Sequence, residues 1–359
     1  MKDKILKLSV FLLVIIAVFL TGYLFNQKIN PLKQTALLDN SLVSRFNPSE
    51  EKTTSPVSLS SLTSDSASFP FIKNSDEVFF YLPKTGEIKS ISLKNPSGGS
   101  KLISKIEPYA NYISWGTDKQ LIAGYNFGSV FYDLDSNFSK KYDSNIKRPV
   151  LSSGGEFIAY AYTDPTESDG NISIADPRLE TQKKILPTRF SDWQISWLSK
   201  EVLFLIRPPT LEDTYFSAFT LDIGSGNLQK KVEPTKDLEI VWPTTSKKLA
   251  YSNLDKFTQE KKLTLIELSS GETTVDLPPD YSAAKCGWDI LDRGIFCIDN
   301  GVLGYFQFLK DSRTSEWQQY DIPGLPNTAR NVRVSSTGEY IVFQNYQDGR
   351  LYALRVPSR

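Results

Sequence analysis

Short apolar runs separated by polar clusters recur along most of this chain. Between residues 239 and 277, four such runs follow one another, at 240–242, 249–251, 263–268 and 273–277. Clusters of Ser, Gly, Pro and Lys bound the runs, and each run is too short to form an amphipathic helix. The pattern therefore predicts four short β-strands in succession.

The same four-strand unit recurs along the chain, and in each copy an apolar anchor residue ends the first strand. The anchors are Ile72, Trp115, Leu151, Trp197, Trp242, Trp288 and Val334. Their spacing ranges from 36 residues, between Trp115 and Leu151, to 46 residues, between Trp288 and Val334. A period of about 40–45 residues with four strands per unit is typical of propeller blades. The sequence therefore predicts an all-β, seven-bladed β-propeller.

Four of the six tryptophans of the chain occupy anchor positions. A ring of indoles could form an aromatic ligand site. Large flat side chains are also what fills the space where neighbouring sheets splay apart. We expect the anchor tryptophans to pack between blades.

Three hairpin segments resemble a known repeat. The pieces SSTGEYIVFQ (335–344), SSGGEFIAYAY (152–162) and TSKKLAYSN (245–253) are similar to the S-P-D-G-K-x-I-A-Y hairpin of TolB-type propeller repeats, although each lacks the Pro. The resemblance extends from about residue 69 to the C-terminus and implies the propeller fold. The family includes binding scaffolds and propellers attached to hydrolases, and no catalytic motif carries over onto residues of this chain.

The N-terminal segment differs from the repeats. Lys2, Lys4 and Lys7 precede an uncharged apolar run of 18 residues, 8–25. Such a run is near the minimum for crossing a membrane as a helix, and its basic flank is expected to stay in the cytoplasm. The run is followed neither by an Ala-x-Ala cleavage site nor by a Cys that could receive a lipid. We therefore expect residues 1–25 to be a retained, single-pass signal anchor, with a cleavable signal peptide as the alternative.

Residues 26–68 are rich in Ser and Thr and have no sustained apolar period, which predicts a stalk before a propeller at 69–359. One piece of the stalk, 55–62, alternates apolar and polar residues as a half-buried strand does. The seventh blade has only three strands of its own, the last at 351–356. We expect 55–62 to pair with 351–356 and to close the ring, the alternative being a three-stranded final blade.

Several classes of chemistry are excluded by composition. The chain contains no His, which rules out a Ser–His–Asp triad and a His-ligated metal site. Lys plus Arg and Asp plus Glu both number 41, so no strong field steers nucleic acid toward the protein. No Gly-rich phosphate loop is present, and we expect no cofactor. A glycosidase or lyase that uses only carboxylates remains compatible with the sequence.

One acidic loop offers oxygen ligands for a calcium ion. Asp164, Glu167, Asp169 and Asn171 could surround the ion, although their spacing does not match an EF-hand loop. The alternative, which we favour, is a solvated loop that turns at Asp-Gly and binds no metal.

The propeller face that carries the connections between blades is rich in aromatic residues and Arg, which interaction surfaces favour. These residues could instead cap the ends of blades. The candidate partner-binding residues are Tyr109, Tyr112, Arg148, Arg189, Phe190, Trp193, Tyr281, Lys285, Arg330 and Arg333.

The two cysteines, Cys286 and Cys297, lie at equal distances from the turn at 289–294. We therefore expect them to oppose each other in a hairpin of the sixth blade, within reach of a disulfide. Two chemical states are then open: the cysteines form a disulfide bond, or they remain free thiols that are buried as small hydrophobic residues.

These features predict a membrane-tethered, extracytoplasmic propeller that acts as a non-enzymatic protein-binding or scaffold module of a cell envelope. The expected localisation is the cytoplasmic membrane with the N-terminus inside, and the expected partners are envelope proteins. Two alternatives are a carbohydrate-binding domain of the envelope and a carboxylate-dependent glycoside hydrolase or lyase.

Overall fold

The structure is a computed structural model that describes residues 57–74, 76–164, 169–211, 214–241, 248–254, 260–268, 273–276, 281–289, 293–308 and 315–356. The chain divides into two units, Met1–Ser55 and Pro56–Arg359, and the described residues all belong to the second. Among them, no helix is long and apolar enough to cross a membrane. The expected signal anchor at 1–25 and most of the stalk lie outside the described residues.

Seven antiparallel sheets of four strands each make up the second unit, which confirms the predicted seven-bladed, all-β propeller. Blade 1 comprises β2 (Ser68–Lys73), β3 (Glu77–Leu82), β4 (Glu87–Ser92) and β5 (Lys101–Lys105), with a short 3-10 helix, η3 (Pro96–Gly98), before β5. Blade 2 comprises β6 (Tyr112–Trp115), β7 (Gln120–Tyr125), β8 (Gly128–Asp133) and β9 (Phe138–Lys141). Blade 3 comprises β10 (Ile146–Leu151), β11 (Ile158–Thr163), β12 (Gly170–Ala175) and β13 (Gln182–Thr188).

The remaining blades follow the same order. Blade 4 comprises β14 (Gln194–Trp197), β15 (Val202–Arg207), β16 (Phe216–Asp222) and β17 (Leu228–Thr235). Blade 5 comprises β18 (Glu239–Val241), β19 (Lys248–Leu254), β20 (Lys261–Glu267) and β21 (Thr273–Asp276). Blade 6 follows η4 (Ala283–Lys285) and comprises β22 (Cys286–Trp288), β23 (Gly294–Asp299), β24 (Val302–Phe308) and β25 (Ser315–Asp321). Blade 7 comprises β26 (Ala329–Val334), β27 (Tyr340–Asn345), β28 (Leu351–Arg355) and β1 (Ser58–Ser61).

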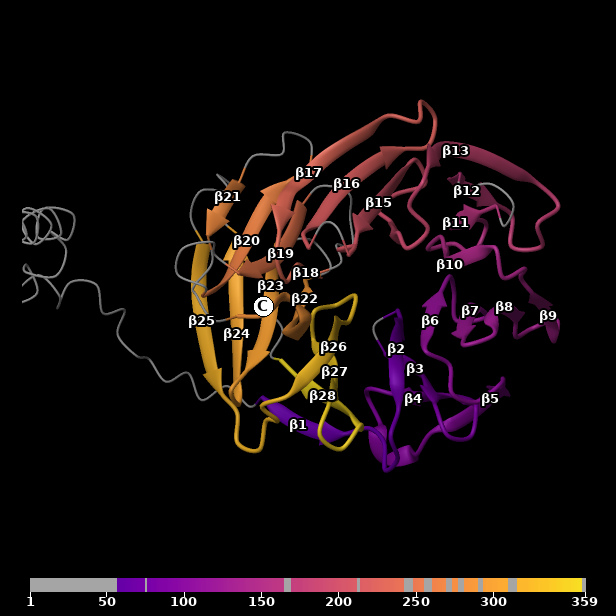
Figure 1. The fold of residues 1–359 in the computed structure, drawn as a ribbon. Helices are drawn as coiled ribbons and strands as arrows, with labels where there is room; N and C mark the ends of the chain where they lie inside the picture. The colour runs from indigo at the N-terminus through magenta and orange to yellow at the C-terminus, as the bar shows by residue number, and fades with distance from the viewer. Residues whose placement is uncertain are drawn as a thin grey trace, which may run out of the picture. The chain divides into compact units, whose positions relative to one another are not determined.

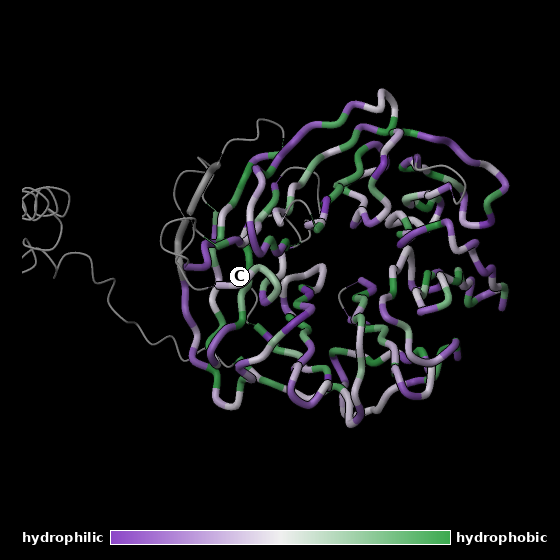
Figure 2. Tube along the Cα trace, in the orientation of Figure 1, coloured by the Kyte–Doolittle hydropathy of each residue, from purple (hydrophilic) through white to green (hydrophobic). Residues whose placement is uncertain are grey.

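The seven sheets are arranged in a ring, and the first strand of each blade lies nearest its centre (Figure 1). Seven hydrophobic clusters form the core, and each is shared by two neighbouring blades. The second strands are therefore packed on both faces and read as continuous apolar runs, such as VLFLIR in β15. Outer strands such as β13 and β17 are mostly hydrophilic (Figure 2).

The anchor tryptophans tie neighbouring blades together, as expected. The indole nitrogen of Trp288 donates a hydrogen bond to the carbonyl of Val241, in the first strand of the preceding blade. Trp115 and Trp197 make the equivalent bonds to the carbonyls of Phe69 and Val150. An indole N–H that is removed from water needs such an acceptor, so these bonds join neighbouring blades. Trp242 lies outside the described residues.

The first strands of blades 1, 3 and 7 each contain a β-bulge. In each, the residue three positions before the anchor adopts a positive φ: 54° at Phe69, 43° at Arg148 and 54° at Asn331. A bulge leaves an extra residue out of the ladder and redirects the side chains that follow. In blade 1, Phe69 is such a residue, and its carbonyl accepts the bond from Trp115.

The hairpin motif of the repeats is explained by one turn that recurs in blades 3 and 7. The hydroxyl of Ser335 accepts a hydrogen bond from the amide of Tyr340 at 3.0 Å, and the carbonyl of Ser335 accepts one from Gly338. Ser152 makes the same pair of contacts with Phe157 and Gly155. Both glycines have φ above 70°, which favours Gly because it lacks a Cβ.

The strand β1 completes the seventh blade, so the ring closes as predicted. It pairs antiparallel with β28, in a register that runs from Ser58 opposite Arg355 to Ser61 opposite Tyr352. Leu59 packs against the cluster between blades 6 and 7. The pairing continues beyond the strand, because the amide of Leu62 bonds to the carbonyl of Leu351 at 2.8 Å.

Cys286 and Cys297 are directly opposite each other in β22 and β23, and they form a disulfide bond. The predicted position of the pair is therefore confirmed. The pair is oxidised in the structure, and the two residues are not free thiols.

Candidate functional site

The strand order gives the propeller two faces with different loops. In an antiparallel four-stranded blade, the loop between the second and third strands and the connection to the next blade leave from the same edge. We call the side of the ring that carries these segments the connection face. The opposite side, which carries the turns between the first and second and between the third and fourth strands, is the hairpin face.

Exposed large hydrophobic side chains are concentrated on the connection face. Six of the eight in the described part of the chain lie there: Tyr109, Phe127, Phe190, Leu211, Tyr215 and Tyr346. The other two are Leu102, on the outer strand β5, and Phe157, on the hairpin face. Scattered single exposures need no explanation, but their collection on one face is typical of an interaction surface.

Four of these aromatic rings are covered by a cation. The guanidinium of Arg330 lies 4.1 Å from the ring centre of Tyr346, and the amine of Lys141 lies 4.7 Å from that of Phe127. Equivalent pairs form between Arg207 and Phe190 and between Lys236 and Tyr215. These contacts hold exposed rings in place. Aromatic and Arg side chains ordered in this way are the residues that contribute most binding energy at protein interfaces.

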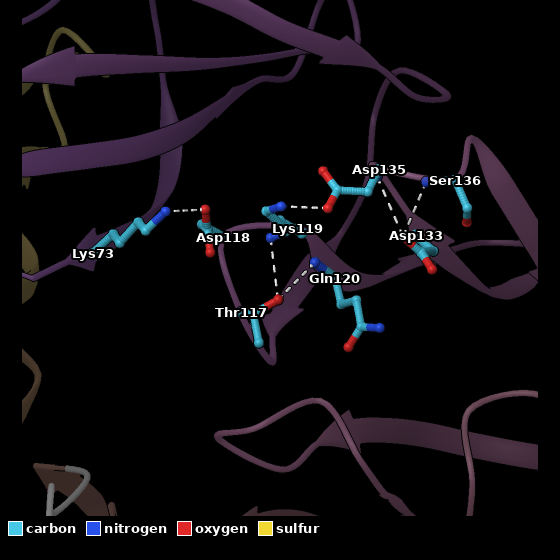
Figure 3. A network of polar contacts seen from close by, with 8 residues as sticks. All are labelled: Lys73, Thr117, Asp118, Lys119, Gln120, Asp133, Asp135 and Ser136. Atoms are coloured by element: carbon cyan, nitrogen blue, oxygen red, sulfur yellow. Dashed lines mark hydrogen bonds and ion pairs between the residues drawn. The ribbon is translucent and has the colours of Figure 1, made fainter.

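The hairpin face is instead occupied by polar turns whose groups pair with one another. Lys73 forms an ion pair with Asp118 of the next blade, and Lys119 forms one with Asp135 (Figure 3). The hydroxyl of Thr117 accepts hydrogen bonds of 3.1 Å from the amides of Lys119 and Gln120 (Figure 3). Such groups contact each other and offer few directed donors or acceptors to a partner.

The structure brings several of the sequence-predicted residues together on the connection face. Tyr109 has 68% of its surface exposed, and Phe190 has 40%. Arg189 is exposed and lies 3.5 Å from a carboxylate oxygen of Asp169. Arg148 is exposed in the bulge of β10, and Arg330 covers Tyr346.

Trp193 corrects the prediction, because it is buried in the core and not exposed to a partner. Only 4% of its surface is accessible, and it packs between blades 3 and 4. Its indole nitrogen donates to the hydroxyl of Thr188 at 3.1 Å, and its ring meets Phe219 edge-on. The exposed ring of the neighbouring Phe190 contacts the Trp193 ring in a T-shaped arrangement. Trp193 therefore supports Phe190 from the core and is not itself accessible to a partner.

Two more predicted residues serve the fold. Tyr281 is half-buried, and its ring meets Phe306 in the core of blade 6. Burial raises the pKa of its phenol. Lys285 forms an ion pair with the buried carboxylate of Asp299 in the same blade. Each of the two caps a blade end, which was the alternative reading of this face.

Sequence reasoning missed Phe127, Leu211, Tyr215 and Tyr346. All four lie between the second and third strands of a blade, whereas the prediction considered only the connections between blades. The sequence could have indicated them, because the alternation of strand directions brings the loops between second and third strands to the same face as the connections between blades. Loops are usually polar, so large apolar residues in the loops of the connection face indicate the candidate interaction surface.

The acidic loop shows no metal site in the part that is described. Asn171 is buried, and its side-chain oxygen accepts a hydrogen bond from the hydroxyl of Ser173. Asp169 faces Arg189. No group of three His, Cys, Asp or Glu side chains that could hold a metal occurs among the described residues, and Glu167 lies outside them.

A cavity of about 530 Å³ lies among the first strands of blades 1, 2, 3, 4 and 7. Tyr112, Trp115, Trp197 and Arg333 contribute to its wall, together with other first-strand residues and with turn residues of the hairpin face. The Tyr112 hydroxyl shares a hydrogen bond of 2.9 Å with that of Ser129. Burial raises the pKa of the Tyr112 phenol to about 12, so it is neutral at physiological pH.

No family model matches this chain, and no curated protein matches it in sequence. Solved structures do match. An oligogalacturonate lyase in complex with manganese has a TM-score of 0.60 at 11% identity, over 85% of this chain and 94% of that one. A chain of the mitotic checkpoint complex has a TM-score of 0.56 at 13% identity, over 83% and 91%.

The β-propeller domain of Cps50 (Swd1) from Myceliophteria thermophila has a TM-score of 0.54 at 9% identity. The match covers 84% of this chain and all of that domain. At identities this low, a likeness shows the fold alone. The comparisons and the strand topology agree that this chain is similar to β-propellers along most of its length.

Proposed function

We propose that this propeller is a non-enzymatic protein-binding module that contacts its partner through the connection face. The observation that carries the proposal is the collection of six exposed apolar side chains on that face, four of them covered by Lys or Arg. The absence of His from the whole sequence supports a binding role, because it removes the commonest general base.

We further propose that the module is tethered outside the cytoplasmic membrane, where its partners are envelope proteins. Two features support this location: the uncharged run at 8–25 behind three lysines, and the disulfide between Cys286 and Cys297. Disulfides persist in oxidising compartments and are rare in the cytosol. The Ser-x-x-Gly turns of blades 3 and 7 support the inference that the repeats are of the TolB type.

Site-specific photo-crosslinking in intact cells tests the binding face. A photoreactive residue at Phe190, which is 40% exposed, is expected to crosslink to a discrete protein. The matched control is Phe157, which is 41% exposed but lies on the hairpin face, and it is expected to give no such product. Equal crosslinking at both positions would contradict the proposal, as would products at Phe190 that consist only of polysaccharide.

A second measurement separates the binding surface from the fold. Phe190→Ala combined with Tyr346→Ala is expected to weaken binding of the captured protein at least tenfold, because exposed aromatic residues dominate interface energies. Both side chains are exposed, so the melting temperature is expected to stay close to that of the parent protein. Unchanged affinity in this double variant would place the interface elsewhere.

A further inference from the structure

One cation that lines the central cavity forms no ion pair with a carboxylate of the described residues. Arg333, on β26, is one of the residues that line it. Within the described part of the chain, its side chain makes one hydrogen bond, from Nη1 to the carbonyl of Val332 at 3.4 Å, and forms no ion pair. By contrast, Lys73, Lys119 and Lys200, the last of which also lines the cavity, each contact a carboxylate.

The bulge in β26 directs Arg333 to this position. The ladder between β26 and β27 shifts between Arg330 and Arg333, and Asn331 in the bulge adopts a φ of 54°. A non-Gly residue in this conformation costs free energy, and bulges that redirect a side chain are frequent beside functional sites. The Arg333 side chain is accessible to solvent but is enclosed by protein, which lowers the pKa of its guanidinium from the usual value. It stays protonated at neutral pH.

Hydroxyl groups occupy the equivalent position in two other blades. Ser114 and Ser196 each precede an anchor by one residue, as Arg333 does, and both line the cavity. The Ser114 oxygen accepts a bond from the amide of Leu151, which leaves its O–H as a donor. Ser196 lines the cavity beside Trp197. Three register-equivalent positions therefore offer one guanidinium and two hydroxyls to the same space.

The charge balance of the cavity is positive. Its lining contains one carboxylate, Glu156, and that group lies 3.0 Å from the amine of Lys200. Arg333 is therefore the charge of the lining that has no counterion among the residues that the structure describes. Phe71, Trp115 and Trp197 form an aromatic part of the wall, where Phe71 and Trp115 stack with ring centres 5.6 Å apart.

We propose that this cavity binds a small organic carboxylate, with Arg333 as its counter-charge. The planar fork of a guanidinium matches a carboxylate in geometry, and the hydroxyls of Ser114 and Ser196 donate to its oxygens or to hydroxyls on its body. The aromatic wall contacts the carbon skeleton. A volume of about 530 Å³ is within the range of small-molecule sites and admits a ligand of the size of a hydroxy acid or a sugar acid. The cavity is distinct from the exposed aromatic residues of the connection face, and its ligand is independent of the protein partner.

Binding of defined probes to the purified propeller tests this site. Acetate, lactate and glucuronate are titrated by calorimetry and by thermal shift, with glucose as the uncharged match of glucuronate and with inorganic phosphate as a second anion. At least one carboxylate is expected to bind at least tenfold more tightly than glucose and phosphate. If no carboxylate binds, or if glucose or phosphate binds equally well, the proposal is overturned.

Two arginines on the same strand provide a matched pair of variants. Arg333→Gln is expected to weaken carboxylate binding at least tenfold, whereas Arg330→Gln, which changes the connection face, is expected to leave it unchanged. Arg333→Lys keeps the charge but loses the planar guanidinium, and its carboxylate affinity is expected to lie between those of Arg333→Gln and Arg330→Gln. Arg333 makes only one long hydrogen bond within the described part of the protein. The melting temperatures of the Arg333 variants are therefore expected to stay near that of the parent protein. Carboxylate binding that survives Arg333→Gln would overturn the proposal.

Discussion

The indole nitrogen of Trp288 donates a hydrogen bond of 2.9 Å to the backbone carbonyl of Val241 in the preceding blade. Trp288 is 3% exposed, so the bond is shielded from water and joins two sheets that share no ladder. Contacts of this kind connect blades that are otherwise held together by apolar packing.

Replacing Trp288 by Phe keeps an aromatic ring but removes the donor. The carbonyl of Val241 then loses its partner, and part of the space of the indole becomes empty. We expect the free energy of unfolding to fall by about 2–4 kcal/mol, from an unsatisfied buried acceptor and a cavity. Urea denaturation measures the change. A loss below about 0.5 kcal/mol would mean that the bond contributes nothing to the ring.

The closing strand supplies a second prediction. Leu59→Asp places a carboxylate against the cluster between blades 6 and 7 and is expected to destabilise the propeller by about 2–3 kcal/mol. Ser58→Asp is the matched control, because Ser58 is exposed on the same strand. Thermal unfolding compares the two variants. If both melt together, the pairing of β1 with β28 does not support the ring in solution.

The disulfide predicts a third outcome. Cys286 and Cys297 are 11 positions apart, and cross-linking a loop of that length stabilises by about 2–3 kcal/mol in the chain-entropy model. The double variant Cys286→Ala, Cys297→Ala is expected to lose about that amount. Thiol titration of the denatured, unreduced protein is expected to find no reactive thiol. Two reactive thiols would show that the bond does not form.

The Tyr112 phenol predicts a dependence of stability on pH. Its pKa is about 10 in the unfolded chain, and burial raises it to about 12 in the fold. The folded state therefore holds the proton more tightly, so this contribution is complete below about pH 10 and is lost as the pH rises toward 12. Tyr125 and Tyr142, whose pKa values burial also raises, contribute with the same sign.

Urea unfolding between pH 8 and pH 11 measures this effect. Stability is expected to fall over the upper part of that range, and Tyr112→Phe is expected to reduce the slope. The variant also loses the hydrogen bond to Ser129, which lowers stability equally at each pH and is read from the plateau below pH 9. A slope that Tyr112→Phe leaves unchanged would contradict the assignment to this residue.

The blade pattern was readable from the sequence because propeller repeats are local. Each anchor, such as Trp197, is followed by its own turn and second strand, and neighbouring strands of a blade are neighbours in sequence. The closing pair of β1 and β28 could be predicted as well, because one strand was missing at one end and an alternating segment was present at the other.

Features that depend on contacts between distant residues were harder to predict. Trp193 lies in an inter-blade connection and was predicted to face a partner, but the core between blades 3 and 4 encloses it. The bulges at Phe69 and Arg148 did leave a signal, since Pro70 and Pro149 interrupt first strands and Pro inside a strand marks an edge or a bulge. The cavity around Arg333 had no such signal, because its wall comes from five blades.

The closure of the ring also determines the order in which the chain can fold. Ser60 contacts Ala353, which lies 293 positions later, so the last sheet is assembled from segments made at opposite ends of synthesis. At about 5–20 residues per second, β1 is made on the order of 15–60 s before its partner exists. Joining segments so far apart costs about 5 kcal/mol in loop entropy if the intervening chain is unfolded. If the intervening blades fold first, they bring the two ends together and remove most of that cost, so we expect completion of the ring to be the final step of folding and not its nucleus.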